Sequence, residues 1–175
     1  MDGISSAQGR GYSALSSAYC QRHEWPERVK TTMTVMTAEQ IEHFLDEVFP
    51  QRMGKIESVG DMTATMRLKI GNEHLRPGPR ISGPTMMGFA DVAMYVAILA
   101  QIGPEPMAVT SDLNCHFLRA ASGDHDIIAH AKLIKLGRRL AVGEVQLFSA
   151  SDETRPVVHV TASYALPQKP DGVSA

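Results

Sequence analysis

The sequence predicts an α+β fold in which a curved antiparallel sheet wraps around one long buried helix. One observation behind this prediction is the apolar stretch 80–103, RISGPTMMGFADVAMYVAILAQIG, which is long enough for a helix of several turns. The other is a set of strand-like segments that follow it with no further helix between them. At 175 residues the chain can form a single domain with a substantial core.

The composition of the chain limits its domain organisation and its possible binding partners. We expect an extension over residues 1–36 that is flexible or docks on a partner subunit, one domain over 37–167, and a flexible tail over 168–175. The chain has 17 basic and 19 acidic residues, so we expect no nucleic-acid partner. The two cysteines lie far apart, the seven histidines show no metal-ligand spacing, and no signal peptide is apparent. We therefore expect no metal and a cytoplasmic location.

The first helix is predicted over residues 37–50, TAEQIEHFLDEVFP. Thr37 and Gln40 have the spacing of a capping box, and Pro50 ends the helix. We expect His43 to face the solvent or to serve as a capping residue. The apolar face, which indicates a packing helix, carries Ile41, Phe44, Leu45 and Val48.

Residues 55–70 alternate between apolar and polar side chains, which predicts a half-buried strand, with room for a shorter pairing segment before it. The following loop 71–79, GNEHLRPGP, leads directly into the long helix. We therefore expect Asn72, His74 and Arg76 to reach whatever binds at the start of that helix. The apolar side of the strand carries Met62, Ala64, Met66, Leu68 and Ile70.

The long helix has a clear start and one ionisable residue in its apolar part. Ser82 and Gly83 can serve at the cap, and Pro84 suits the first turn because no backbone donor is lost there. Apolar residues on every side indicate a buried helix. A membrane span is the poorer interpretation, since Asp91 lies in the middle and no basic flanks are present. We expect no membrane partner.

Gly83 and Asp91 are candidate functional groups. The free N–H groups at the helix start favour an anion or a developing oxyanion. A carboxylate buried in an apolar helix needs a reason, which is catalysis or a structural hydrogen bond. The two residues are roughly 12 Å apart along the axis at 1.5 Å per residue, too far for one small substrate carbon to touch both. If both are catalytic, two antiparallel copies of the helix share the site, which predicts a dimer.

After the helix, the sequence predicts four antiparallel strands over residues 107–118, 126–136, 139–149 and 156–166, arranged as a meander. The turn residues between them lie at 121–124, 137–138 and 151–154. Several methionines of the long helix, including Met86, Met87 and Met94, suggest an adaptable apolar pocket.

Three blocks in this order carry a family resemblance: SGPTMMGFADVA, AVTSDLNCHFLRAA and KLIKLGRRLAVGEVQLF. They resemble the hotdog-fold acyl-CoA thioesterases of the phenylacetate-pathway (PaaI-like) type, over residues 55–166. The resemblance implies that Asp91 activates water or acts as a nucleophile, that the Gly83 N–H polarises the thioester carbonyl, and that Thr110 positions the water. It also implies that the basic turn with Arg138 and Arg139 binds coenzyme A phosphates.

The chain departs from the family pattern at three positions. Ser82 stands where the family has histidine, Pro84 replaces its second glycine, and Arg76 stands where it has asparagine. Asn72 replaces that asparagine only if the loop follows a different path. The remaining expected substrate contacts are His74 and Met87.

The resemblance implies hydrolysis of an aromatic or short-to-medium-chain acyl-CoA to a carboxylate and CoA, with no cofactor beyond the coenzyme A of the substrate. A homodimer or a dimer of dimers, with sites at the subunit interface, is expected. The alternative is a non-hydrolytic acyl-CoA-binding protein of the same fold. A hotdog dehydratase ranks last, because no histidine accompanies the acid on the helix.

Overall fold

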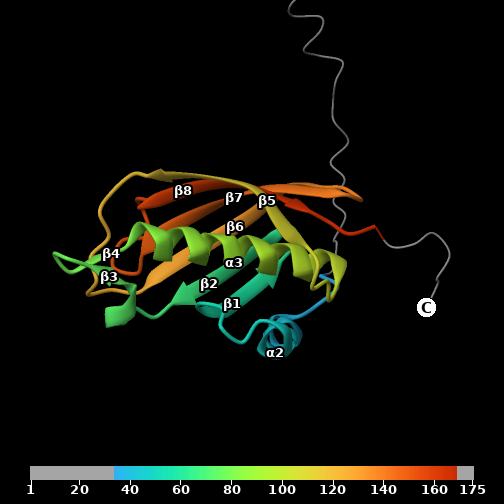
Figure 1. The fold of residues 1–175 in the computed structure, drawn as a ribbon, viewed down its shortest axis with the longest axis horizontal. Coiled ribbons are helices and arrows are strands. Elements are labelled where there is room, and N and C mark those ends of the chain that lie inside the picture. Colours follow the sequence, from blue (N-terminus) through green and yellow to red (C-terminus); the bar gives the residue numbers. More distant parts are fainter. Residues whose placement is uncertain (1–33, 169–175) are drawn as a thin grey trace, which may run out of the picture. The chain divides into compact units, whose positions relative to one another are not determined.

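The computed structural model describes residues 34–168, which form a six-stranded antiparallel sheet with one long helix lying across one face (Figure 1). This confirms the predicted α+β hotdog architecture. Residues 1–33 and 169–175, which contain most of the predicted extension and tail, lie outside the described residues. The elements in chain order are α2 (Ala38–Val48), β1 (Lys55–Gly60), β2 (Thr63–Leu68), the 3-10 turn η1 (Asn72–His74), β3 (Leu75–Arg76), β4 (Arg80–Ile81), α3 (Gly83–Ile102), β5 (Val109–Phe117), β6 (Ile127–Leu136), β7 (Leu140–Ser149) and β8 (Val158–Ala165).

Helix α3 is the core of the domain. Ser82 is its N-cap, and Gly103 ends it with a φ of 89° and an N–H that donates to the Leu99 carbonyl at 3.0 Å. Every residue from Val92 to Ala100 is buried. By length and composition α3 could cross a membrane, but 72% of its most apolar window is buried inside the domain. The apolar character of α3 is therefore explained by its burial against the sheet.

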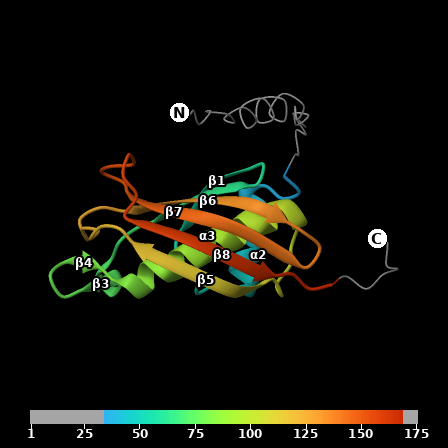
Figure 2. The same ribbon diagram turned by 90° about the horizontal axis from the view of Figure 1, so that it is seen from above.

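The sheet order is β1-β2-β6-β7-β8-β5, so β5 occupies one edge beside β8 (Figure 2). The predicted meander is correct for β6, β7 and β8 but wrong for β5, which pairs with the last strand of the chain instead of with β6. Residues 103–108 alone connect α3 to β5, so the strand must begin close to the C-terminal end of the helix.

Residues 55–70 form two strands rather than one long one. The chain reverses at Asp61 and Met62, where Met62 has a φ of 57°, and β1 and β2 pair antiparallel across this turn. Three of the predicted inward side chains, Ala64, Met66 and Leu68, are buried. The alternating pattern continues through the turn, which explains why the sequence reads as one strand.

Helix α2 has the predicted capping box. The Gln40 N–H donates to Thr37 Oγ1 at 3.3 Å, and the Thr37 N–H donates to Gln40 Oε1 at 2.9 Å. Ile41 and Leu45 are fully buried, whereas Val48 is 45% exposed, so the apolar face is narrower than predicted. The side chain of His43 is exposed, as predicted.

The turn between α2 and β1 packs tightly on α3 through Gly54. This residue has a φ of 81°, which favours glycine. A Cβ atom placed there would lie 2.5 Å from the ring of Phe89 and 2.9 Å from the Arg67 carbonyl oxygen. Gly54 therefore serves both the backbone turn and the close approach of the buried Phe89.

Candidate active site

The start of α3 presents a free backbone donor. Ser82 Oγ accepts from the Thr85 N–H at 3.3 Å and lies 2.8 Å from the Thr85 hydroxyl, while the Ser82 N–H donates to the His74 carbonyl at 2.9 Å. Gly83 is the first helical residue, and its N–H has no hydrogen-bond acceptor among residues 34–168. This donor and the helix dipole together can stabilise a carbonyl oxygen or an oxyanion.

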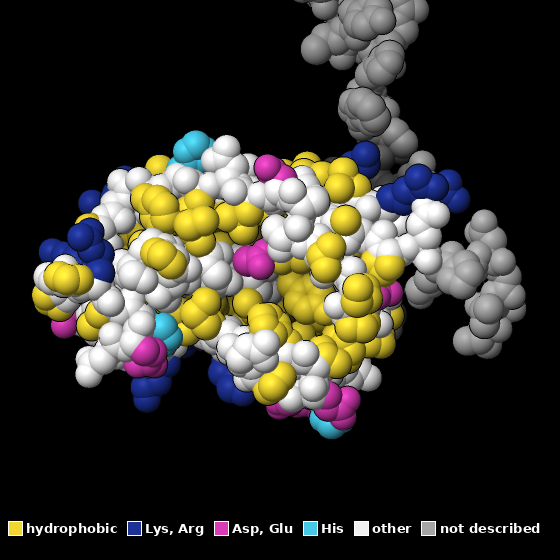
Figure 3. All heavy atoms as spheres, viewed as in Figure 1, with side chains coloured by type: hydrophobic (Ala, Val, Ile, Leu, Met, Phe, Trp, Pro, Cys, Tyr) yellow, Lys and Arg dark blue, Asp and Glu magenta, His cyan; other side chains and the backbone are white. Residues whose placement is uncertain are grey.

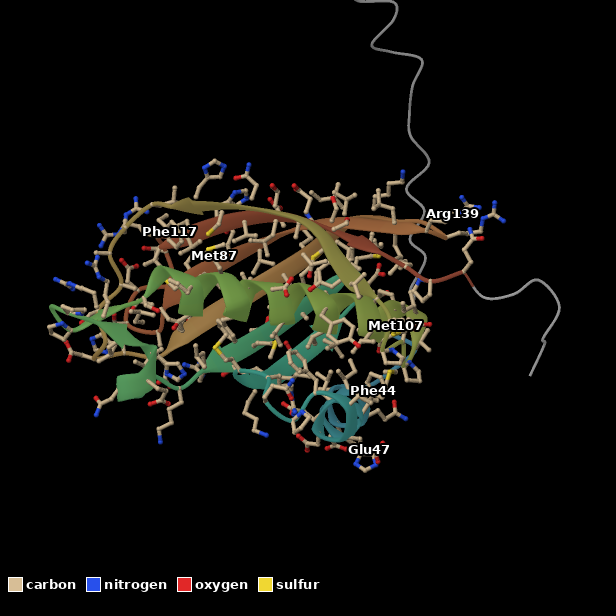
Figure 4. The ribbon with its side chains drawn as sticks, viewed as in Figure 1. Phe44, Glu47, Met87, Met107, Phe117 and Arg139 are labelled. Atoms are coloured by element: carbon tan, nitrogen blue, oxygen red, sulfur yellow. The ribbon has the colours of Figure 1, made fainter. Side chains whose placement is uncertain are left out.

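The ring of Phe117, at the end of β5, lies against Gly83. A Cβ atom on Gly83 would be 3.2 Å from Phe117 Cζ, closer than an ordinary van der Waals contact. Phe117 is 50% exposed and Met87 is 37% exposed. Both lie toward the N-terminal end of α3, where they give the free N–H apolar surroundings (Figure 4).

Asp91 projects from the middle of α3 and is held by two hydroxyl groups. Thr110 Oγ1, on β5, donates to Asp91 Oδ1 at 2.6 Å. The Tyr164 hydroxyl, on β8, lies 2.6 Å from the same Oδ1 and 2.8 Å from the Asp91 carbonyl oxygen. The expectation of a buried carboxylate is wrong, because Asp91 is partly exposed. Its other carboxylate oxygen, Oδ2, has no hydrogen-bond partner within the part of the chain that the structure describes.

Tyr164 is the residue of this site that sequence reasoning missed. It is 3% exposed, and its ring stacks on Tyr95 with a centroid distance of 6.3 Å and an interplanar angle of 9°. The alternation in VHVTASYA places Tyr164 on the inward face of β8, but nothing in the sequence links this face to Asp91. Burial and the neighbouring Asp91 raise the pKa of Tyr164 far above its ordinary value of 10.0, so the phenol stays protonated and can donate.

Gly83 and Asp91 of one chain do not converge. They are eight residues apart on a continuous helix, so roughly 12 Å separates them along its axis. Within one chain, a substrate carbonyl at the Gly83 N–H is therefore out of reach of the Asp91 carboxylate.

The loop before α3 contributes mainly through its backbone. Asn72 and Arg76 are exposed, and neither side chain forms a hydrogen bond with any described residue of α3. His74 is half-buried, and its Nδ1 accepts from the Gly71 N–H at 2.9 Å, which leaves the proton of a neutral ring on Nε2. Pro84 is exposed in the first turn of α3.

Arg138 and Arg139 lie at the opposite end of α3 from Gly83 (Figure 4 labels Arg139). They line a cavity of about 700 Å³, whose wall also includes Ile102, Glu105 and Leu166. The distance from Asp91 to Ile102 along the helix axis is about 16 Å, from eleven residues at 1.5 Å each. The structure therefore separates the basic turn from Asp91 by about half of the helix and from Gly83 by its whole length.

Two of the methionines that suggested an adaptable pocket belong to the core. Met86 is 5% and Met94 is 0% exposed, so Met87 alone of these three reaches the surface. Among the described residues, no group of three or more His, Cys, Asp or Glu side chains is arranged to hold a metal ion.

Comparison with known proteins identifies the family. The model of the thioesterase superfamily matches residues 78–155. A protein from Silicibacter sp. TM1040 assigned as a thioesterase is 38% identical, with 79% of this chain and 96% of that chain covered and a TM-score of 0.71. No curated protein matches the chain.

Two more distant structures show the same fold. A mutant of the phenylacetic acid degradation protein PaaI from Thermus thermophilus is 21% identical, with 71% of this chain and 99% of that chain covered and a TM-score of 0.58. A hypothetical thioesterase from Streptococcus pneumoniae, solved with coenzyme A, is 18% identical, with 74% and 98% covered and a TM-score of 0.63. The family model and the 38% identity over nearly the whole length of the first relative show that this chain belongs to the thioesterase superfamily.

Proposed function

We propose that the protein is an acyl-CoA thioesterase that hydrolyses an aromatic or short-to-medium-chain acyl-CoA to a carboxylate and CoA. The observation that carries this proposal is the state of Asp91: it is partly exposed, with Oδ1 bound to Thr110 and Tyr164 and with Oδ2 unpartnered in the described structure. A carboxylate that is fixed on one oxygen and open on the other can accept a proton from water.

In the proposed reaction, Oδ2 of Asp91 removes a proton from a water molecule, and the oxygen of that water attacks the thioester carbonyl carbon. The Gly83 N–H donates to the carbonyl oxygen and stabilises the negative charge that develops there. The tetrahedral intermediate then collapses, the C–S bond breaks, and the leaving CoA sulfur takes the proton from Asp91. Atoms balance as acyl-CoA plus water giving carboxylic acid plus CoA thiol.

We infer that a second copy of the chain supplies the Gly83 N–H. One chain cannot bring Gly83 and Asp91 to the same carbonyl, whereas two antiparallel α3 helices can. The free edge of β5 and the neighbouring surface of α3 form an apolar face on the side seen in Figure 3. The exposed apolar residues on α3 and β5, or next to β5 in the chain, are Met87, Met107, Val109, Phe117 and Leu118. An unpaired edge strand with such side chains fits pairing with a second β5.

The cavity beside Arg138 and Arg139 is the proposed site for the phosphate groups of CoA. Guanidinium groups bind phosphate oxygens bidentately, and this cavity lies on the same chain as the Asp91 that would act on the thioester. The pantetheine arm of the substrate would cover the distance between them.

The first test is thiol release from benzoyl-, phenylacetyl-, hexanoyl- and decanoyl-CoA by the unchanged protein and by Asp91→Asn. We expect hydrolysis of at least one substrate, and a loss of at least about 100-fold in kcat for the variant, since it removes the base. Equal activity of both proteins would refute the role of Asp91.

The engagement of Ser82 in the helix cap, where the family has histidine, favours a non-hydrolytic acyl-CoA-binding protein as the second candidate. CoA binding without release of any thiol would support that candidate.

The role of Gly83 can be tested with a matched pair of variants. Gly83→Pro removes the N–H at a helix position that tolerates proline, whereas Gly83→Ala adds a Cβ atom but keeps the N–H. We expect Pro to reduce kcat much more than Ala. Equal losses in the two variants would assign the effect to contact with Phe117 instead of to the donor.

Mixing inactive subunits tests the shared site. In a heterodimer of Asp91→Asn with Gly83→Pro, one of the two composite sites contains both native groups, so random mixing should restore about a quarter of the native activity. No recovery in a mixture shown to contain heterodimers would refute a site shared between two chains.

A further inference from the structure

Tyr164 makes the closest contacts of any buried side chain to the proposed catalytic carboxylate. Its hydroxyl lies 2.6 Å from Asp91 Oδ1 and 2.8 Å from the Asp91 carbonyl oxygen. Thr110 Oγ1 approaches the same Oδ1 at 2.6 Å from the other strand. Three elements, α3, β5 and β8, therefore meet at one carboxylate oxygen.

The number of protons on these hydroxyl groups limits how many hydrogen bonds they can donate. A phenol and a threonine hydroxyl each have one proton to donate. The Asp91 carbonyl already lies within the hydrogen-bonded interior of α3, and a hydrogen bond to an ionised carboxylate is stronger than one to a neutral carbonyl. Donation from both hydroxyl groups to Oδ1 is therefore the arrangement that best satisfies the ionised side chain.

Tyr164 is itself held in place, so it can fix its partner. Its ring is buried and lies parallel to the ring of Tyr95. The Tyr95 hydroxyl donates elsewhere, to the Glu105 carbonyl at 2.9 Å, and forms no hydrogen bond with Asp91 among the described residues. A rigid donor that reaches only one carboxylate oxygen restricts rotation of the group about its Cβ–Cγ bond.

We propose that Tyr164 is a positioning residue: together with Thr110 it holds Oδ1 of Asp91 so that Oδ2 is the oxygen that faces the substrate water. This inference rests on the proposed function, because the carboxylate matters to a reaction only if Asp91 is the base. It adds a buried residue that lies 73 positions from Asp91 in the chain and that acts through this carboxylate.

The test uses Tyr164→Phe, with Tyr95→Phe as a matched control. Each variant removes one phenol hydroxyl from the same stacked pair, but only Tyr164 donates to Asp91. For Tyr164→Phe we expect kcat to fall about tenfold, the loss typical of one hydrogen bond to a charged group, with KM changed less than about twofold. Tyr95→Phe should leave both kcat and KM unchanged, because its hydroxyl forms no hydrogen bond with Asp91.

A purely structural role would give a different pattern. Loss of packing alone would lower the stability of both variants and leave kcat per folded enzyme at the native value in both. A native kcat in Tyr164→Phe, while Asp91→Asn is inactive, would overturn the proposal.

A measurement without turnover separates this proposal from the proposed function. In a protein labelled with ¹³C at aspartate side-chain carbons, the resonance of the Asp91 carboxyl carbon, measured at one fixed pH and assigned by its absence in Asp91→Asn, should change position in Tyr164→Phe and stay in place in Tyr95→Phe. That result with no thioester hydrolysis would retain the positioning contact and refute the thioesterase assignment. An unchanged resonance position in both variants would refute the contact itself.

Discussion

Gly54→Ala should destabilise the domain more than any other alanine substitution at a glycine in a turn with positive φ. The new Cβ atom would lie 2.5 Å from the Phe89 ring and 2.9 Å from the Arg67 carbonyl oxygen. Phe89 is fully buried and a backbone carbonyl in β2 cannot move away, so the clash can be relieved only by shifting the core. Overpacking of this kind costs about 1–3 kcal/mol. The φ of 81° adds about 1–2 kcal/mol, because left-handed backbone is unfavourable for alanine.

Gly78→Ala is the matched control. Gly78 has a φ of 87°, but a Cβ atom there would meet nothing within 4 Å. Gly78→Ala should therefore lower the free energy of unfolding only through its left-handed backbone, by about 1–2 kcal/mol, whereas Gly54→Ala should lower it by about 2–5 kcal/mol. Urea unfolding followed by far-ultraviolet circular dichroism measures both, provided that the m-value is unchanged. Equal losses in the two variants would refute the packing role of Gly54.

Three further predictions concern the helix cap, the basic turn and the acid stability of the domain. Ser82→Ala should lower the free energy of unfolding by about 1 kcal/mol through loss of the cap of α3, and Thr37→Ala in α2 gives a comparison; no loss in thermal or urea unfolding would contradict the role of the Ser82 hydroxyl. Replacing Arg138 and Arg139 together by alanine should raise KM for an acyl-CoA several-fold and leave KM for the corresponding acyl-pantetheine, which lacks the nucleotide phosphates, unchanged; an equal rise for both substrates would place the phosphates elsewhere. Hydrogen bonds from Thr154 and Arg155 lower the pKa of Asp152 from 3.8 to about 2, so its contribution to stability is present above pH 3.8 and is lost as the pH falls toward 2. The dependence of Tm on pH in this acid range should be weaker in Asp152→Asn, and identical curves would count against the contact.

The elements whose ends carry local signals were predictable from sequence. The limits of α3 follow from Ser82, Pro84 and Gly103, because caps and a positive φ are properties of a few adjacent residues. The capping box of α2 is another such case. In contrast, the neighbour of β5 depends on where α3 delivers the chain, and strand alternation carries no information about partners.

The candidate site was predictable only in part for the same reason. Asp91 stands out as the lone charge in an apolar helix, and the resemblance points to Thr110, whose hydroxyl does reach it. Tyr164 looks like an ordinary inward strand residue until the register of β5 against β8 places it opposite Thr110. Met86 and Met94 show the converse error, since a residue type suited to a pocket is equally suited to filling a core.

The pairing of β5 with β8 also determines when the site can form during folding. The hairpins β1–β2 and β6–β7 join segments that are close in the chain, and such contacts form early because little loop entropy is lost. The contact between β5 and β8 spans two intervening strands and closes the sheet at its edge. Asp91 meets Thr110 and Tyr164 only when that closure is complete. During refolding, recovery of the contacts of Asp91 should therefore lag behind formation of the β1–β2 and β6–β7 hairpins, because these contacts need a long-range strand pairing.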